Sequence, residues 1–329
     1  MLLKADKNNS ITVAVDGNGG DRDALAGIGK AAKFALTLYP GMKLIVYGAR
    51  RLEEDLARGQ ALGPRCEFRP APVQIPQDES PRSVLSGYSQ SSMRKAIECV
   101  REGEAQAVIS AGGTGPLVVL SRHILGTIGR IRPALCAKIP AGPGRFSLML
   151  DLGANARCTP EDLCCFARLG TAAGRVILGE SEPACAVLNI GSELGKGNEL
   201  VQGARELISS CKGLRCNGFT EADRLFTGDN DIIVTDGFTG NIALKSAEGV
   251  ARVFFHGQGL KRYFAKLARP EWLMPWQYNG SLLLGVRGTV VKSHASARQE
   301  ALAVAIVEAA KAVKAGLCQA LEEDPLTRP

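Results

Sequence analysis

The chain has 329 residues, of which 45% are hydrophobic and 22% are charged, and its formal net charge is +7 at pH 7. This composition is that of a globular protein with room for a large α/β domain and an appendage. The positive charge is too small and too scattered to predict nucleic-acid binding, although it suits an acidic partner or an anionic surface. No apolar stretch is long enough to span a membrane, and residues 1–10 are too short and polar for a signal peptide.

The ten cysteines and three histidines do not form a metal-binding pattern. There is no pair of C-x-x-C motifs, and no histidine has ligand spacing to a cysteine. We therefore expect reduced thiols, no metal and no cofactor, in a cytoplasmic protein.

Short runs of Val, Ile and Leu predict parallel strands that are buried on both faces and alternate with helices. In chain order, we expect a flexible leader at 1–10, a strand at 11–16, a helix over about 22–38, a strand at 42–48, a helix at 51–59 and a proline-rich connection at 64–81. A helical segment at 89–102, a strand at 105–110 and a helix from about 116 follow. A long helix at 297–322 precedes a loose tail at 323–329. The pattern predicts a single α/β domain over 11–322 with a mostly parallel sheet.

Five of the apolar runs end in a small polar cluster built around glycine, at 11–21, 105–115, 147–155, 185–199 and 231–241. Ligands of open parallel sheets bind outside the carboxyl ends of the strands, so five such loops predict one composite active site. Glycine lets backbone N–H groups approach an anion, and hydroxyl, amide and ammonium groups remain to bind it. The candidate residues are Asp16, Gly19, Gly20, Asp21, Ser110, Gly112, Gly113, Thr114, Asp151, Asn155, Asn189, Lys196, Asn198, Glu199, Asp236, Thr239 and Asn241.

Two further segments could complete an anion site. Ser91 and Ser92 stand at a predicted helix start, where hydroxyls and free N–H groups bind phosphate, although such residues more often serve as a plain helix cap. The DGNGGD segment (16–21) could likewise be only a strand-to-helix turn with an aspartate cap. His294 follows a glycine-rich stretch and could be an acid, a base, an oxyanion donor or a surface residue.

Together, the motifs resemble one family, the bacterial phosphate acyltransferases of phospholipid synthesis, in order over residues 11–300. The fragments that carry the resemblance are IxVAVDxxGGD (11–21), SSM (91–93), ISAGxTG (109–115), RPAL (132–135), LDLGAN (150–155), NIGxExxKGNE (189–199), DGFTGNxxLK (236–245) and LLGVxGxVVKxH (283–294). Each fragment is modest alone, and the ordered set is very specific.

The resemblance implies a three-layer αβα fold, similar to phosphotransacetylases and isocitrate-dehydrogenase-like proteins. It implies a homodimer with long helices that project around 245–280. The implied reaction converts acyl-ACP, the thioester of acyl carrier protein, and inorganic phosphate to acyl-phosphate and free ACP. Lys196, Asn241, Lys245 and His294 are then expected to act in catalysis, and the other candidates to bind phosphate and substrate.

The sequence departs from the family pattern at three places. Gly17-Asn18 stands where Ala-Met is usual, Gly113 stands where Asn is usual, and Ala295 and Ala297 change the ending after His294. These changes leave open a slow enzyme or an altered acyl preference. Two alternatives remain: a phosphotransacetylase-like enzyme acting on acyl-coenzyme A, and a weakened homologue that binds ACP or organises lipid enzymes at the membrane.

Residues 250–276 predict a basic amphipathic segment. Five Lys or Arg and no Asp or Glu lie between Gly249 and Pro270, and Leu260, Tyr263, Phe264 and Leu267 form one helical stripe. Such a segment can lie on an anionic membrane surface, so we expect transient peripheral association with the membrane. Docking of acidic ACP and packing inside the dimer are the alternatives.

Overall fold

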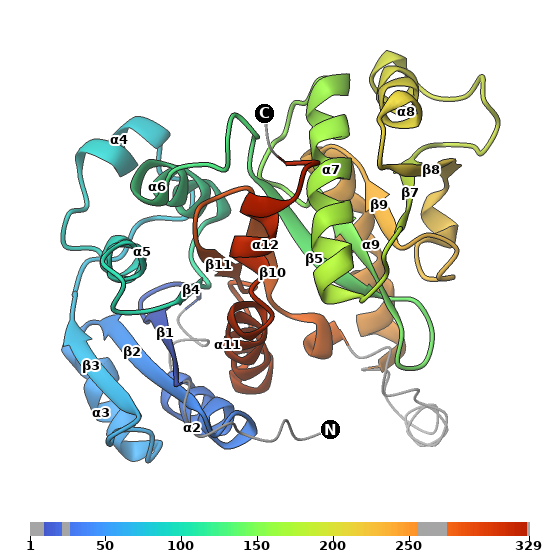
Figure 1. The fold of residues 1–329 in the computed structure, drawn as a ribbon. Coiled ribbons are helices and arrows are strands. Elements are labelled where there is room, and N and C mark those ends of the chain that lie inside the picture. Colours follow the sequence, from blue (N-terminus) through green and yellow to red (C-terminus); the bar gives the residue numbers. More distant parts are fainter. Residues whose placement is uncertain (1–9, 22–26, 256–274, 328–329) are drawn as a thin grey trace. The chain divides into compact units, whose positions relative to one another are not determined.

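The computed structural model describes residues 10–21, 27–255 and 275–327, and these divide into two compact units. The first unit contains residues up to Pro133 together with Asn279–Glu323, and the second contains Ala134–Tyr278 and Asp324–Thr327 (Figure 1). A single catalytic domain over 11–322 stays a prediction. The expected leader at 1–10, apart from Ser10, and most of the basic segment lie outside the described residues.

The first unit is built on a mostly parallel sheet in the order β3-β2-β1-β4-β11-β10. Only the β10–β11 pair is antiparallel among these neighbours. The strands are β1 (Ile11–Asp16), β2 (Met42–Gly48), β3 (Cys66–Pro70), β4 (Ala107–Ser110), β10 (Ser281–Leu284) and β11 (Thr289–Lys292). Every residue of β4 is buried, as expected for a parallel strand covered on both faces.

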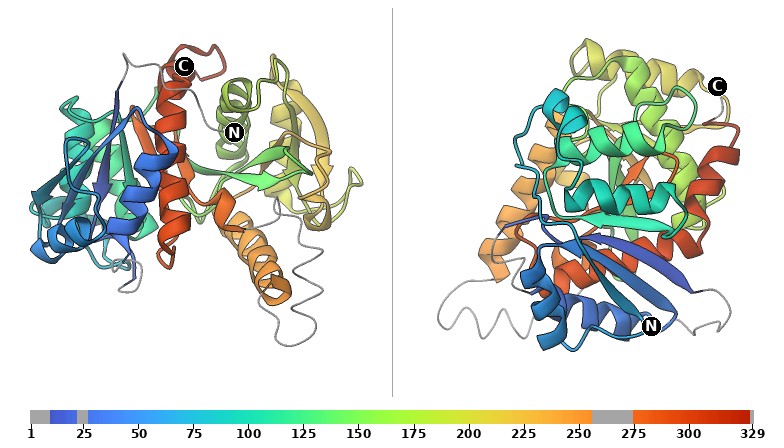
Figure 2. Two further views of the ribbon diagram at one scale, coloured as in Figure 1. Left: turned by 90° about the horizontal axis from the view of Figure 1, so that it is seen from below. Right: turned by 90° about the vertical axis from the view of Figure 1, so that its left-hand side faces the viewer.

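Helices cover both faces of this sheet. Helices α2 and α11 pack together, and α5 contacts β1, β2 and β4 and packs on α6; Figure 2 shows these pairs on opposite sides of the strands. The helices are α2 (Ile28–Leu38), α3 (Arg50–Arg58), α4 (Pro81–Ser86), α5 (Ser92–Arg101), α6 (Thr114–Leu125), α11 (Gln299–Lys314) and α12 (Leu317–Glu323).

The predicted strands at 11–16 and 42–48 have the expected bounds, whereas two other expectations are wrong. The expected helix at 297–322 is two helices, because Gly316 has φ +65° and ends α11. The proline-rich connection contains a strand, β3, which pairs with β2 at the edge of the sheet, where a terminal proline is tolerated.

The second unit has a sheet in the order β5-β6-β9-β7-β8, in which β5 and β6 form an antiparallel hairpin and the other pairs are parallel. Helices α7 and α8 pack on each other and on the sheet, and α7 and α9 lie on opposite sides of the strands (Figure 2). The elements are β5 (Ala134–Pro140), β6 (Phe146–Leu150), α7 (Pro160–Ile177), β7 (Ala184–Leu188), α8 (Glu199–Ser210), β8 (Arg215–Thr220), η1 (Ala222–Arg224), β9 (Ile232–Val234), α9 (Gly237–Phe255) and η3 (Pro275–Tyr278).

The C-terminal segment is packed rather than loose as far as Thr327. Arg175 Nη1 on α7 donates to Asp324 Oδ2 at 2.7 Å, and Leu326 and Thr327 are buried. The prediction of a loose tail over 323–329 is therefore wrong for the residues described, because an ion pair and the burial of Leu326 and Thr327 hold this segment in place. Within the described ranges, no helix has the length and apolar character needed to cross a membrane.

Candidate active site

Asp16, the last residue of β1, is a buried carboxylate in the first unit. Ser92 Oγ donates to its Oδ1 at 2.5 Å, and Ser110 Oγ donates to its Oδ2 at 2.6 Å. Ser110 Oγ also accepts from the backbone N–H of Gly112 at 3.0 Å. One carboxylate thus ties together the end of β1, the start of α5 and the loop between β4 and α6.

Burial raises the pKa of the Asp16 carboxyl, while the two serine hydroxyls and the N–H groups of Asn18 and Gly19 oppose that rise. The hydroxyls donate to the ionised form and stabilise it, so each of them offsets part of the cost of removing the charge from water. Asp16 is therefore a positioning residue, which holds the end of β1, the start of α5 and the loop between β4 and α6 together.

Strand register brings three loops to one edge of this sheet. Asp16 lies beside Ser110 in the β1–β4 pair, and Ser110 lies beside Lys292 in the β4–β11 pair. The Asp21 N–H donates to the Ala295 carbonyl at 2.9 Å, which joins the first loop to the segment after β11. His294 belongs to that segment, is exposed, and donates its backbone N–H to Asn279 Oδ1 at 3.1 Å.

Lys292 is a cation at this edge that the sequence reasoning did not select. The rule that located the other candidates would have found it, because it ends a buried parallel strand and is followed by small and polar residues. Its ammonium group donates to the Ser293 carbonyl.

The glycines of these loops are required by close packing. An ideal Cβ on Gly19 would lie 2.6 Å from Asp16 Oδ2 and 2.7 Å from the Gly112 nitrogen. Gly20 has φ +98°, a conformation that favours glycine. The loop after β1 and the loop after β4 therefore touch through their backbones, as an anion-binding cradle requires.

Two departures from the family pattern have structural explanations. A Cβ on Gly113 would lie 2.5 Å from the Gln77 carbonyl oxygen, so the 71–80 connection fills the space that a side chain would need. Asn18 is buried, donates to the Ala71 carbonyl at 2.9 Å and accepts from the Ala49 N–H at 3.1 Å. Nothing in the structure explains Ala295 and Ala297.

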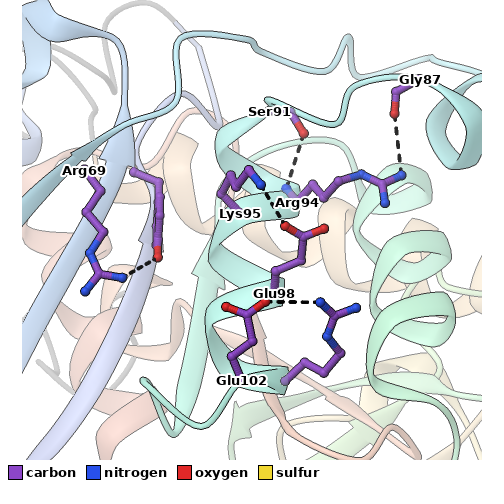
Figure 3. Close-up of polar contacts among 9 residues, drawn as sticks. Arg69, Gly87, Ser91, Arg94, Lys95, Glu98 and Glu102 are labelled. Carbon is purple, nitrogen blue, oxygen red and sulfur yellow. Dashed lines mark hydrogen bonds and ion pairs between the residues drawn. The ribbon is translucent and has the colours of Figure 1, made fainter.

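The two serines at the start of α5, Ser91 and Ser92, help to hold the fold together. Ser91 caps α5 by accepting from the Arg94 N–H at 3.3 Å, and the Arg94 side chain reaches the Gly87 carbonyl (Figure 3). Ser91 and Ser92 are both buried, and Ser92 is bonded to Asp16. The helix-cap interpretation is thus confirmed for Ser91, whereas phosphate binding by either serine stays a prediction.

Asp151 has the corresponding place in the second unit, at the end of β6. It is fully buried, and its Oδ1 accepts from the N–H groups of Leu135 and Ala154 at 2.8 and 3.1 Å. Its Oδ2 accepts from the backbone and side-chain amides of Asn155 at 2.7 and 2.9 Å. Burial raises the pKa of Asp151, and these four bonds oppose the rise. Asp151 and Asn155 therefore shape a loop.

Helix α9 begins directly on that loop. Asp236 Oδ1 caps the helix by accepting from the N–H groups of Phe238 and Thr239 at 3.0 and 2.9 Å. A Cβ on Gly240 would lie 2.2 Å from the Asp151 carbonyl oxygen, so only glycine allows this approach.

The remaining candidates of α9 are near its start. A Cβ built on Gly153 would lie 3.5 Å from Asn241 Nδ2, so the Asn241 amide lies over the 151–155 loop. Thr239 and Lys245 are exposed.

The loop between β7 and α8 is held by Asn189. Its Nδ2 donates to the Lys196 carbonyl at 3.0 Å, and its Oδ1 accepts from the Ile190 N–H at 2.8 Å. Asn198 caps α8 by accepting from the Val201 N–H at 3.1 Å, and the exposed Glu199 lies in the first turn. Lys196 itself is exposed, which leaves its ammonium group accessible to an anion.

Within each unit, the candidate residues do gather at strand ends. Asp16, Asp21, Ser92, Ser110 and the 112–114 loop belong to the first unit, and the candidates from Asp151 to Lys245 belong to the second. Convergence of Lys196, Asn241, Ser92 and Thr114 on one pocket joins both units and stays a prediction. In the part of the chain that the structure describes, no three His, Cys, Asp or Glu side chains are grouped so as to hold a metal ion.

Comparison with known proteins identifies the family. The model of a family described as fatty acid synthesis protein matches residues 11–320. A phosphate acyltransferase of Aeromonas salmonicida is 40% identical over 316 residues, which is 92% of this chain and 93% of that protein. A phosphate acyltransferase of Pseudomonas putida (strain GB-1) is 40% identical over 325 residues, covering 94% of this chain and 96% of the relative.

The chain belongs to the phosphate acyltransferase family. It is therefore an acyltransferase enzyme, as the ordered motifs predicted. A phosphotransacetylase from Streptococcus pyogenes superposes with a TM-score of 0.62 at 14% identity, over 92% of this chain and 94% of that one. The EutD phosphotransacetylase from Staphylococcus aureus gives 0.60 at 16% identity, over 92% and 94%. These likenesses confirm the predicted α/β fold.

The hydroxyl of Ser110 is expected to contribute more to stability than that of Ser121. Ser121 lies on α6 and is buried like Ser110. Replacing Ser110 by Ala removes a donor to Asp16 and leaves the carboxylate less satisfied, at a cost of about 1–3 kcal/mol in the free energy of unfolding. Ser121 Oγ has no hydrogen-bond partner among the residues that the structure describes, so Ser121→Ala is expected to change stability by less than about 0.5 kcal/mol.

Denaturant unfolding of both variants over a range of pH checks this. The Ser110 bond lowers the pKa of Asp16, so the variant's deficit is greatest at pH values where Asp16 is ionised and shrinks as the pH falls through the folded-state pKa. Equal losses for the two variants would contradict the assigned role of Ser110.

Gly240 and Gly249 of α9 provide a second matched pair. Gly240→Ala forces a methyl group against the Asp151 backbone and is expected to cost about 1–3 kcal/mol. Within the described part of the chain, nothing lies within 4 Å of a Cβ at Gly249, so Gly249→Ala is expected to stabilise the helix by up to about 1 kcal/mol. Thermal unfolding measures both, and a tolerated alanine at 240 would show that α9 does not rest on the 151–155 loop.

Proposed function

We propose that the enzyme transfers an acyl group from acyl-ACP to inorganic phosphate, giving acyl-phosphate and free ACP for phospholipid synthesis. The observation that supports this most is the family membership over nearly the whole chain, combined with glycine-spaced loops at the carboxyl ends of the strands. Acyl-ACP is favoured over acyl-coenzyme A by the motif resemblance.

The reaction needs three things from the protein: a site for a multiply charged anion, donors for the developing oxyanion, and alignment of both reactants. A phosphate oxygen attacks the thioester carbonyl carbon, the carbonyl oxygen becomes an oxyanion, and the C–S bond breaks as the carrier's thiolate leaves and takes a proton. Positioning and preorganised donors supply most of the rate in such a reaction.

The described residues suit these needs. Helix α6 begins at Thr114 without any side-chain cap, so its first N–H groups are available at the edge where Asp16 and Ser110 lie. In the second unit, the exposed ammonium groups of Lys196 and Lys245 are placed in a glycine-rich loop and on α9. We assign phosphate binding to the free N–H groups at the start of α6. We assign oxyanion stabilisation to Lys196 and Asn241.

Dimer formation and membrane association belong to the same proposal. On α9, Val250 is 57% exposed and Val253 is 76% exposed, which leaves an apolar face for a partner or a lipid surface. Co-sedimentation with anionic liposomes tests the membrane surface, and wild-type protein that never pellets would contradict it.

Deacylation of a long-chain acyl-ACP should require inorganic phosphate and no added metal. Mass spectrometry of the carrier follows the loss of the acyl group, with matched reactions lacking phosphate and reactions with acyl-coenzyme A. Equal release without phosphate would identify a thioesterase, and faster turnover of acyl-coenzyme A would favour the phosphotransacetylase alternative.

Removing a proposed oxyanion donor should lower the rate without unfolding the protein. Lys196→Ala and Asn241→Ala are each expected to lower kcat on the order of 10²–10³-fold. Lys43→Ala, at an exposed position of β2, is the control and should keep wild-type activity. Near-full activity of folded Lys196→Ala and Asn241→Ala proteins would remove both residues from the mechanism.

A further inference from the structure

Asn279, which directly follows η3, is a buried polar residue that the sequence motifs did not select. Its side chain is 2% exposed. Its Nδ2 donates to Ser293 Oγ at 2.9 Å and to the Ala301 carbonyl at 2.7 Å. Its Oδ1 accepts from the backbone N–H of His294 at 3.1 Å. A buried amide with satisfied donors and acceptor holds its neighbours in one arrangement.

The partners of Asn279 require an amide at this position. The His294 N–H is a donor and needs an oxygen, whereas the Ala301 carbonyl is an acceptor and needs an N–H group. A carboxylate would place an acceptor against the Ala301 carbonyl, and an alkyl side chain would remove the partner of both backbone groups. The Asn279 amide therefore joins the first turn of α11 to the segment that follows β11.

The backbone is held on both sides of His294. The Ser293 N–H donates to the Ser110 carbonyl at 2.9 Å, and the His294 carbonyl accepts from the Ala297 N–H at 3.1 Å. The bond from Asn279 fixes the peptide group between these two points. His294 is nevertheless exposed. A group that must meet a ligand needs this combination of a fixed backbone and an accessible side chain.

The same segment lies at the sheet edge to which we assign phosphate binding. Lys292 lies beside Ser110 in the β4–β11 pair, and the loop after Ser110 leads into the uncapped start of α6. The Asp21 N–H donates to the Ala295 carbonyl at 2.9 Å, so the residue after His294 is tied to the loop after β1. From this place an imidazole N–H can donate to a phosphate oxygen.

We propose that Asn279 is a positioning residue of the acyl transfer, whose amide sets the backbone of His294 so that the imidazole meets phosphate bound at the start of α6. This inference rests on the proposed function and adds to it a residue that acts through His294 without touching the substrate. A displacement of a reacting group by about 1 Å can cost on the order of 10²-fold in rate, so one backbone bond is enough to matter.

Anchoring of α11 is the competing role for Asn279. The next residue, Gly280, is packed on this helix, because its φ is +111° and a Cβ there would lie 3.0 Å from the Ala305 Cα. If Asn279 served only to hold α11, its loss would act on the whole fold and independently of His294. A double-mutant cycle distinguishes the two roles.

Asn279→Ala and His294→Ala are each expected to lower kcat for phosphate-dependent deacylation of acyl-ACP by about tenfold to a hundredfold. The double variant should be no slower than His294→Ala, because Asn279 acts through the histidine. Ile306→Val removes one methyl group from a buried residue of α11 and none of the Asn279 bonds, so it is the control for lost packing and should keep wild-type kcat. Losses that multiply in the double variant would assign Asn279 to the fold alone.

NMR of the imidazole groups tests the position of His294 without turnover. The chain has three histidines, so the spectrum is simple, and His294→Ala identifies the relevant signal. Inorganic phosphate should shift the His294 signal of the wild-type protein and leave that of His123, which is exposed on α6, unchanged. In folded Asn279→Ala the shift should be lost or need at least about tenfold more phosphate.

The phosphate titration separates failure of this inference from failure of the proposed function. If acyl-ACP is not turned over, yet phosphate shifts His294 in the wild-type protein and not in Asn279→Ala, the proposed reaction is wrong and the positioning role stands. An equal shift in both proteins, or no shift of His294 in the wild-type protein, would show that Asn279 does not position His294 for phosphate. Asn279→Ser, whose shorter hydroxyl does not reach both partners, takes the place of Asn279→Ala if that variant does not fold.

Discussion

A buried carboxylate at the end of a central strand organises the candidate site in each unit. Asp16 is the last residue of β1 and Asp151 directly follows β6, and both are removed from water. Such a charge is tolerated only when hydrogen-bond donors surround it, and here the donors come from neighbouring loops and helix starts. Ser92 and Ser110 serve Asp16, while Leu135 and Asn155 serve Asp151. The position of each loop therefore depends on satisfying one aspartate.

The glycines follow from the same constraint. Donors reach the carboxylates only if the loops approach one another through their backbones, and a Cβ at Gly19 or Gly240 would collide with Asp16 or with the backbone of Asp151. The glycines that suggested phosphate binding are therefore partly explained by the close packing of the loop backbones. What remains for chemistry is the set of exposed groups at the same edges, notably Lys196, Lys245 and Thr239, together with uncapped helix N–H groups.

Much of this arrangement could be predicted from local sequence. Continuous apolar runs located the strands at 11–16 and 42–48, and the strand-end rule placed Asp16 and Ser110 side by side at the end of the sheet. Partnerships could not be predicted, because the Ser92–Asp16 bond joins residues 76 positions apart and leaves no local signal. Strand β3 was missed because the prolines of the 64–81 segment obscure a pairing that only the neighbouring β2 creates.

The exposed apolar face of α9 was missed for a related reason. Apolar residues at helical spacing normally predict a buried helix face, and Ile242 and Val250 fit that pattern. Their exposure is visible only when the helix is seen beside the loop after β7 and η1. Sequence alone could not assign a role to Ser91 either. A serine that caps a helix, as Ser91 does, and a serine that binds a ligand at a helix start have the same local sequence.

The central claim is that the enzyme uses phosphate itself as the nucleophile on an acyl thioester. Mass spectrometry of the products formed from acyl-ACP and ¹⁸O-labelled phosphate tests it directly. The account predicts acyl-phosphate that contains every heavy oxygen of the labelled phosphate, with free ACP formed in equal amount. Release of unlabelled fatty acid as the first product, with no labelled acyl-phosphate, would show that water attacks the thioester and would contradict the account.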